Sequence, residues 1–275
     1  MRIRRLETFI YYIVIFPRMN LGEAVEEVLG RELEAKVKDY CICIRYTYVE
    51  LENGGFGVYH TPIEDYEVPK FRKLSGKRAI ELFRLRNEKN MLLRALAWAA
   101  ANAASSARVN GLDGLYYDAS PAELAGVRSG DRVLMIGNMK ALKEELLSIG
   151  AVTVVLERKY ELRHDALPDT FIEELEMDFD FVFVTGSAIA VPTFERLLER
   201  ISKIPKKAIT GPFSSLFPTL LHEIGFDVVS GVSVEDVESI KEFLRQGNFL
   251  QGHPGALKTR GLSNAVKVWT SVRAL

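Results

Sequence analysis

The sequence predicts an α/β protein in which a Rossmann-like parallel-sheet domain follows a small α+β domain. After about Gly111, short apolar strands alternate with helices, which is typical of a parallel sheet buried on both faces. Before it, a helix, a hairpin and two further helices form a separate pattern. The turn-forming run 110–114 lies between the two patterns, so we expect domains at residues 1–110 and 111–275.

Composition excludes several classes of protein. The 275 residues carry 36 basic and 37 acidic side chains, a net charge of -1, so no overall field attracts a polynucleotide and we expect no nucleic-acid partner. The apolar run Phe9–Phe16 is too short to span a membrane, and the Pro17–Asn20 segment after it has no signal-peptide cleavage site. We therefore expect a cytoplasmic protein without a membrane partner, in which this run forms a buried strand or helix.

The two cysteines favour the same compartment. Cys41 and Cys43 lie two apart in a predicted strand and so face the same side, where they are poorly placed for a disulfide with each other. We interpret them as small hydrophobic residues of a protein in a reducing cytoplasm rather than as a redox or metal site.

In the first domain, apolar residues at helical spacing predict a helix from Leu21 to about Lys38. Cys41–Val49 reads as a strand, and the glycines that follow Asn53 predict a hairpin turn into Phe56–Tyr59. The remaining helices are predicted from their caps, one from Ser75 to about Leu85 and one from Asn90 to Ala107. The second is rich in alanine, so another backbone can approach it closely, within the chain or across a homodimer interface.

The second domain begins with a short helix that Ser120 caps and Gly126 ends. Apolar runs predict five strands, at 132–137, 152–156, 179–184, 207–210 and 226–230. Helices are expected between and after them, at about 140–148, 192–201, 216–224 and 233–245; Gly150 is expected to end the first and Ser233 to cap the last. Residues 265–272 are predicted to add an edge strand.

In open α/β sheets, ligands bind beyond the carboxyl ends of the strands, where the strand order reverses. We therefore expect a small-molecule site formed by the residues that follow these strands, together with the buried amide of the alanine-rich helix: Asn102, Gly137, Asn138, Glu157, Thr185, Gly186, Ser187, Gly211, Pro212, Ser214 and Ser215. Asn102 either faces this cleft or ties the two domains together.

The first strand-to-helix turn has one glycine, Gly137, where a dinucleotide fingerprint has three. Glu157 follows 20 residues later at a strand end, where a carboxylate can accept both hydroxyls of a ribose. A nucleoside-type ligand without a pyrophosphate fits this pair better than NAD. The alternative is that Glu157 is a solvated surface residue.

The later turns suit an anion. Thr185–Ser187 offers hydroxyls beside a glycine, and Gly211–Ser215 precedes a helix, whose free N–H groups attract negative charge. Each is alternatively a plain turn with a cap. No metal site is predicted, because the four histidines (His60, His164, His222 and His253) lack ligand spacing. The G-x-S-x-G elbow and the P-loop are absent, which disfavours serine catalysis and nucleotide hydrolysis.

Several short motifs occur in the order and spacing of a known family. They are the alanine-rich Leu96–Ala103, Gly137, Leu156-Glu157, Thr185-Gly186-Ser187 with Thr193, Gly211–Ser214, and Gly225 through Gly231 to Asp236. This set, within about Asp39 to Gly247, resembles the DUF364 family with a DUF4213-type N-terminal region. The resemblance implies an enolase-N-terminal-like domain, a Rossmann-like domain and a cleft between them. The family's name refers to heavy-metal chelation, which implies making or processing a chelating small molecule.

The chain departs from the family pattern at two positions. Val191, followed by Pro192, stands where an asparagine is expected before Thr193, and Gly137-Asn138-Met139 replaces Gly-His-Phe. Both changes remove a polar or ligating group, which weakens direct metal ligation more than binding of a small molecule.

Three functional hypotheses follow. The first is an enzyme or binding protein for a small polar metabolite, with Glu157 as a diol-binding group or a base. The second is a metal scavenger without turnover, which the cysteine and histidine pattern disfavours. The third is a methyltransferase-like protein that uses S-adenosylmethionine, which the glycine-poor first loop weakens. The residues name no catalytic group and no cofactor.

Overall fold

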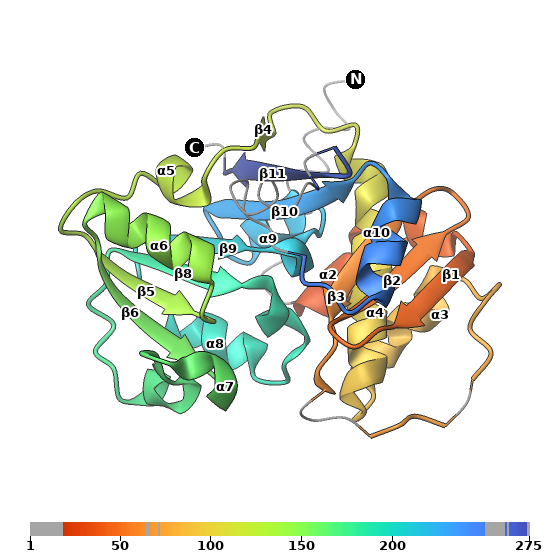
Figure 1. Ribbon diagram of the computed structural model, residues 1–275, viewed down its shortest axis with the longest axis horizontal. Helices are drawn as coiled ribbons and strands as arrows, with labels where there is room; N and C mark the ends of the chain where they lie inside the picture. The colour runs from red at the N-terminus through yellow and green to blue at the C-terminus, as the bar shows by residue number, and fades with distance from the viewer. Residues whose placement is uncertain (1–18, 64–66, 71, 251–261, 263, 274–275) are drawn as a thin grey trace.

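The computed structural model describes residues 19–63, 67–70, 72–250, 262 and 264–273. A three-stranded antiparallel sheet and an eight-stranded, mainly parallel sheet lie side by side, with helices around both (Figure 1). This confirms the predicted α/β class. The run Phe9–Phe16, predicted to form a buried strand or helix, and His253 lie outside the described residues.

The small sheet comprises β1 (Val37–Ile42), β2 (Tyr46–Leu51) and β3 (Phe56–His60), in that order. The predicted hairpin between β2 and β3 is confirmed. The prediction of a single strand over Cys41–Val49 is wrong, because the chain reverses after Ile42 and the N–H of Cys43 donates to the carbonyl of Tyr46. This tight turn contains no glycine, asparagine or proline, the residues by which sequence reasoning recognises a reversal.

The helices of the first domain agree with the predicted ones to different degrees. Helix α2 (Leu21–Val28) ends well before Lys38, because a short turn η2 (Glu32–Glu34) already leads into β1. Helix α3 (Ala79–Phe83) begins after Arg78 rather than Ser75 and continues as η4 (Arg84–Asn87). Helix α4 (Met91–Val109) is confirmed with its cap, since the Asn90 side chain accepts from the N–H of Leu93.

Helix α4 packs directly on β3 through two glycines. A methyl group added at Gly57 would lie 2.2 Å from the Ala103 nitrogen and 2.3 Å from the Ala99 oxygen, and one added at Gly55 would lie 2.4 Å from the Ala103 oxygen. The predicted close approach to the alanine-rich helix is therefore confirmed, and it occurs within the chain. Because this alanine surface is buried, a homodimer needs another surface and stays a prediction.

The large sheet has the order β4-β11-β10-β9-β8-β5-β6-β7. Its strands are β4 (Tyr116–Tyr117), β5 (Arg132–Ile136), β6 (Val152–Glu157), β7 (Leu167–Pro168), β8 (Phe181–Thr185), β9 (Lys206–Thr210), β10 (Val228–Val234) and β11 (Val266–Val272). From β5 the chain moves outward to β6 and β7, then returns to the other side of β5 for β8, β9 and β10. These six strands are parallel, and the strand order reverses between β5 and β8, as in a Rossmann fold.

The two remaining strands complete one side of the sheet. The predicted strand at 265–272 is confirmed as β11, which pairs antiparallel with β10. Its predicted place at the edge is wrong, because β4 pairs outside it. Two tyrosines alone form β4 in the described chain, too short a run to give a periodic signal in the sequence.

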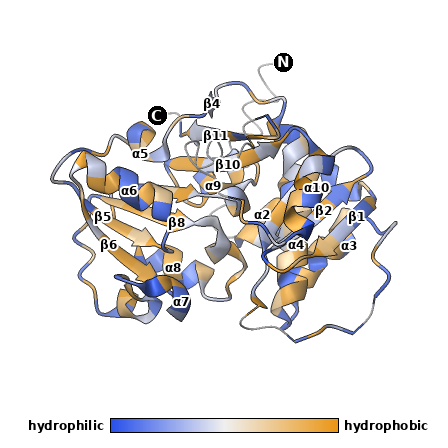
Figure 2. Cartoon of the chain, viewed as in Figure 1, coloured by the Kyte–Doolittle hydropathy of each residue, from blue (hydrophilic) through white to orange (hydrophobic). Residues whose placement is uncertain are grey.

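Helical segments precede, connect and follow the parallel strands, and polar and apolar residues are mixed along them (Figure 2). They are α5 (Pro121–Ala125), α6 (Lys140–Ile149), α7 (Tyr160–Arg163), η5 (Asp169–Glu173), η6 (Gly186–Ala190), α8 (Phe194–Arg200), η7 (Pro212–Ser214), α9 (Pro218–Glu223) and α10 (Val237–Arg245). The Ser120 cap and the left-handed Gly126 and Gly150 ends are confirmed. Asp236 rather than Ser233 caps α10, because β10 continues through Val234.

Helix α10 belongs to the second half of the sequence but packs on the small sheet, opposite α4. Lys241 is 6% exposed, and its Nζ lies 2.9 Å from carboxylate oxygens of both Asp39 and Glu50. Gly57 in β3 pairs with Val49, the residue before Glu50 in β2. Successive residues of a strand point to opposite faces, so Gly57 and Glu50 face opposite sides of the small sheet. Helices α4 and α10 therefore cover its two faces. A buried charge network therefore fixes the two sheets relative to each other.

We expect Gly57→Ala to lower the free energy of unfolding by about 1–3 kcal/mol, because α4 must move away from β3 to admit the methyl group. Urea denaturation measures this change. Gly111→Ala is the matched control, since nothing lies within 4 Å of its added methyl group. Equal loss in both variants would contradict the close-packing argument.

We expect Lys241→Met to cost about 3 kcal/mol of unfolding free energy, because it leaves two carboxylates without their shared buried cation. Lys267→Met removes a half-exposed lysine 3.6 Å from Glu235 and should cost less than about 1 kcal/mol. The double variant Lys241→Met/Glu50→Gln should recover part of the loss. A Lys241→Met protein as stable as Lys267→Met would show that the network adds nothing.

Candidate ligand-binding site

The strand order reverses between Gly137, after β5, and Thr185, at the end of β8. Gly137 has a φ of 92°, a conformation that favours glycine, and a methyl group added to it would lie 2.5 Å from Cγ2 of Thr185. The Thr185 side chain thus packs against the first turn, at the place where a pyrophosphate approaches the backbone in dinucleotide-binding domains. A ligand at this edge must therefore lie outside the Thr185 side chain.

Glu157 links the loops that follow β5 and β6. It is 8% exposed; its Oε2 accepts from the N–H of Asn138 and its Oε1 from the N–H of Lys159, both at 2.8 Å. The alternative of a solvated surface glutamate is therefore wrong. An ionised carboxylate has about four acceptor positions, of which these bonds use two.

Further bonds make these two loops one unit. The Asn138 amide donates to the carbonyl of Leu162 at 2.7 Å, and Arg163 Nε donates to the carbonyl of Glu157 at 3.0 Å. The asparagine that replaces the family's histidine thus has a defined place, in which it holds helix α7 against the first turn.

His60 and Lys159 meet at this edge, although the spacing of the histidines predicted no ligand role for His60 and no motif singled out Lys159. Lys159 Nζ lies 2.7 Å from Nε2 of His60, and both side chains are partly buried. Because a lysine ammonium only donates hydrogen bonds, Nε2 of His60 is the acceptor. The two residues are 99 apart in sequence, and only the packing of the two halves of the chain brings them together.

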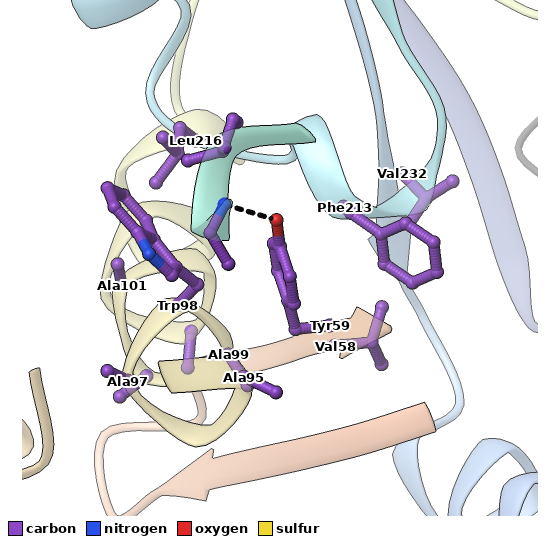
Figure 3. Packing of buried hydrophobic residues seen from close by; sticks show 14 of the residues in the cluster. Val58, Tyr59, Ala95, Ala97, Trp98, Ala99, Ala101, Phe213, Leu216 and Val232 are labelled. Carbon is purple, nitrogen blue, oxygen red and sulfur yellow. Dashed lines mark hydrogen bonds between the residues drawn. The ribbon is translucent and has the colours of Figure 1, made fainter. Parts of the chain in front are cut away.

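Tyr59, the residue before His60, holds the loop after β8. Its hydroxyl lies 3.0 and 2.9 Å from the carbonyls of Gly186 and Ser187, to which it donates, and it accepts from the N–H of Ala190 at 2.9 Å. Figure 3 shows Tyr59 rising from β3 beside α4 to reach this backbone nitrogen. Burial raises the pKa of Tyr59 well above its usual value, so the hydroxyl stays protonated.

Asn102 ties the two halves together, which decides between the two predicted roles. It is 1% exposed, and its amide donates to the carbonyl of Val58 at 2.8 Å and to that of Phe213 at 3.2 Å. Its Oδ1 is buried and has no partner among the described residues. The residue thus connects α4, β3 and η7 and does not line an open surface.

The Gly211–Ser215 loop is held by its own hydroxyls. Ser214 donates to the carbonyls of Gly211 and Ser230, and Ser215 donates to that of Pro212 and accepts from the N–H of Val232. Both serines are buried, so their hydroxyls set the shape of the loop. A methyl group added at Gly186 would lie 2.3 Å from the Ser214 nitrogen, so η6 and η7 touch through their backbones.

The predicted site residues therefore separate into two groups. One group lies toward the edge with His60 and Lys159 and comprises Gly137, Asn138, Glu157, Thr185 and Ser187; the hydroxyls of Thr185 and Ser187 are 3.2 Å apart. The other group, Asn102, Gly186, Gly211, Pro212, Ser214 and Ser215, supports the loops from beneath. Ligand contact stays a prediction for all of them.

A cavity of about 360 Å³ lies at the opposite edge of the sheet. Phe181, Lys206 and Val228 line it, at or near the amino ends of β8, β9 and β10, with Lys207, Asp227 and Arg273 nearby. Ligand sites of this fold class lie at the other edge, and there the polar groups of both halves converge. We therefore place the candidate site at the carboxyl edge.

Metal-ligand clusters and membrane-spanning helices are both absent from the described part of the chain. Across the described ranges, no three or more His, Cys, Asp and Glu side chains gather in a way that holds a metal ion. Within the same part of the chain, no helix has the length and apolar character needed to cross a membrane.

Sequence comparison decides the family. The DUF364 family, described as "Putative heavy-metal chelation", matches residues 120–259, about half of the chain. This chain belongs to the DUF364 family. The DUF4213 family, with the same description, matches residues 25–105. The predicted resemblance is thus confirmed, while the predicted boundary at residues 110 and 111 stays a prediction.

One related protein and two crystal structures resemble the DUF364 protein over most of its length. A protein of Methanocaldococcus jannaschii is 27% identical over 256 residues, 87% of this chain and 96% of that protein. Crystal structures of DUF364 proteins of unknown function agree in fold. The one from Pyrococcus horikoshii has a TM-score of 0.78 at 22% identity and covers 93% of this chain and 100% of that chain. The one from Desulfitobacterium hafniense DCB-2 has a TM-score of 0.71 at 18% identity, with 91% and 99% coverage.

We expect Tyr59→Phe to lower the free energy of unfolding by about 1–3 kcal/mol, because it leaves a buried N–H and two carbonyls without their partner. Tyr160→Phe, on an 83% exposed side chain, is the matched control and should change little. Chemical denaturation followed by circular dichroism compares them. The same unfolding midpoint in both variants would show that Tyr59 does not hold the η6 loop.

Proposed function

We propose that this DUF364 protein binds a small polar metabolite with an anionic group at the carboxyl edge of the large sheet. The observation that carries the proposal is the 2.7 Å contact between Lys159 and His60 beside Glu157. It joins the end of β3 to the loop after β6, so polar side chains from both halves of the chain meet at one point, with Lys159 as the donor.

The donors at this point suit an anion. The ammonium of Lys159 is a positively charged hydrogen-bond donor that contacts His60. The hydroxyls of Thr185 and Ser187 belong to the end of β8, which is separated from β6 by β5. A carboxylate or phosphate group above these side chains would accept hydrogen bonds from several of them at once.

Glu157 supplies the complementary acceptor. Its two unused acceptor positions are available to a diol or another pair of hydroxyls, as the spacing of Glu157 from Gly137 predicts for a ribose. The packing of Thr185 on Gly137 favours a ligand that does not need a pyrophosphate site between β5 and β8. These features together support a nucleoside-sized molecule rather than a dinucleotide.

The family's description concerns heavy metals. Because the described residues form no cluster of three or more metal ligands, they support a role in handling a chelating small molecule better than direct storage of the metal. The arrangement is compatible with binding alone and with catalysis, and Glu157 and His60 are the groups near the site that can accept a proton.

A ligand screen by thermal shift tests the proposal, with nucleosides, S-adenosylmethionine, pterins, flavins, small phosphorylated acids and divalent metals. A ligand at about 100 times its dissociation constant adds about 2.7 kcal/mol of stability. We expect one polar metabolite to stabilise the wild-type protein, and Lys159→Met to weaken its binding at least about tenfold by removing a charged hydrogen bond.

Lys203→Met is the matched control, because it removes the same charge from an exposed residue after α8, away from the site. Glu157→Gln is a less specific probe. Both oxygens of the Glu157 carboxylate accept hydrogen bonds from backbone N–H groups, and the NH2 group of a glutamine would place a donor against one of these donors. Equal affinity in wild type and Lys159→Met would reject the site. Stabilisation by metals alone would favour a metal-binding protein without turnover.

A further inference from the structure

The two cysteines, at a distance from the candidate site, lie in contact with each other. Sγ of Cys43 is 2.6 Å from Sγ of Cys41, and both are free thiols. The expectation that they are poorly placed to pair assumed one continuous strand. Because β1 ends at Ile42 and Cys43 enters the turn, its side chain folds back toward Cys41.

The pair faces α10, on the side of the small sheet that carries Asp39 and Tyr48. Arg245, the last residue of α10, donates to a carboxylate oxygen of Asp39 at 2.9 Å and to the hydroxyl of Tyr48 at 2.6 Å. Tyr48 is the direct cross-strand neighbour of Cys41. The charged and titratable groups around the thiols are therefore Asp39 on β1, Tyr48 on β2, and Arg245 with Lys241 on α10.

The two thiols are unequal. The hydrogen bond from the Cys43 thiol, helped by the charge of Arg245, lowers the pKa of Cys41 to about 7 against the opposing effects of burial and of Asp39. The same hydrogen bond and burial raise the pKa of Cys43. Cys41 is also the more exposed of the two, so it combines access with thiolate character, the two requirements for a reactive cysteine.

We propose that Cys41 and Cys43 form a redox-active dithiol, which low-molecular-weight disulfides convert into an intramolecular disulfide. The sulfurs are already within about 0.6 Å of the length of a disulfide bond. The proposal does not depend on the ligand site, since none of its residues takes part in the reaction.

The reaction balances as two exchanges. The Cys41 thiolate attacks one sulfur of the small disulfide, forms a mixed disulfide and releases one thiolate. Cys43 then loses its proton, its sulfur attacks the sulfur of Cys41, and the second small thiolate leaves. Two protein thiols are oxidised, one small disulfide is reduced to two thiols, and the two protons pass to those products.

Glutathione disulfide is the probe, and the sequence makes its result unambiguous because the chain has only these two cysteines. After treatment of the reduced protein, we expect thiol titration to find neither thiol, and the intact mass to fall by two hydrogens without a lasting glutathione adduct. A wild-type protein that keeps both thiols, or that accumulates the adduct, would overturn the proposal.

Single variants separate the two roles. Cys43→Ser should stop at a stable glutathione adduct on Cys41, because the resolving thiol is missing. Cys41→Ser should react at least about tenfold more slowly, because the remaining thiol is buried and protonated. Equal rates in the two variants would contradict the assignment of Cys41 as the attacking group.

The pH profile tests the electrostatic part. As pH rises through 7, the Cys41 thiolate forms, so the initial rate should rise with a midpoint near the lowered pKa of about 7 rather than near 8.5, the usual value for a cysteine. Arg245→Gln should raise this midpoint, while circular dichroism shows that the fold is kept. Identical midpoints in both proteins would exclude the contribution of Arg245, and a wild-type midpoint near 8.5 would refute the activated thiolate.

Discussion

The backbone contact between α4 and β3 determines the position of most other groups at the candidate site. Gly57 lets the helix approach until Ala99 and Ala103 touch the strand. Asn102, on the same helix, then reaches the carbonyls of Val58 and Phe213, and Tyr59 reaches the loop after β8. A side chain at position 57 would move the helix and displace these bonds together, because they share one rigid support.

The opposite face of the small sheet is held by charge rather than by close backbone packing. Lys241 serves two carboxylates, and Arg245 extends the network to Tyr48 beside the thiols. Such a buried network contributes less to net stability than to the choice of one arrangement, because its desolvation cost offsets much of its attraction. In this DUF364 protein it makes α10 a further link between the two sheets, in addition to Tyr59 and Asn102, and it places a guanidinium near Cys41.

The carboxyl edge of the large sheet combines these two effects. Its loops are supported from beneath by buried serines and an asparagine, whose polar groups are satisfied mainly by backbone partners. The side chains left toward the edge come from three strand ends, and His60 comes from the other half of the chain. A site shared by both halves is rigid only while their contacts persist, so the functional chemistry depends on packing residues that never touch a ligand.

The sequence by itself determined the local features of this protein. Apolar runs predicted the parallel strands β5, β6, β8 and β9, and the caps at Asn90, Ser120 and Gly150 predicted helix ends, because both signals depend on neighbours a few residues apart. The list of strand-end residues followed from the rule for parallel sheets. The turn at Cys43 and the two-residue strand β4 were not predicted from the sequence, because neither has a local residue pattern. Tertiary structure alone decided which strand-end residues face outward, that Lys159 meets His60, and that the two thiols touch. The physical reason is the same for each. These contacts depend on a chain reversal or on the packing of elements that are distant in sequence, and the spacing of apolar residues along the chain predicts neither.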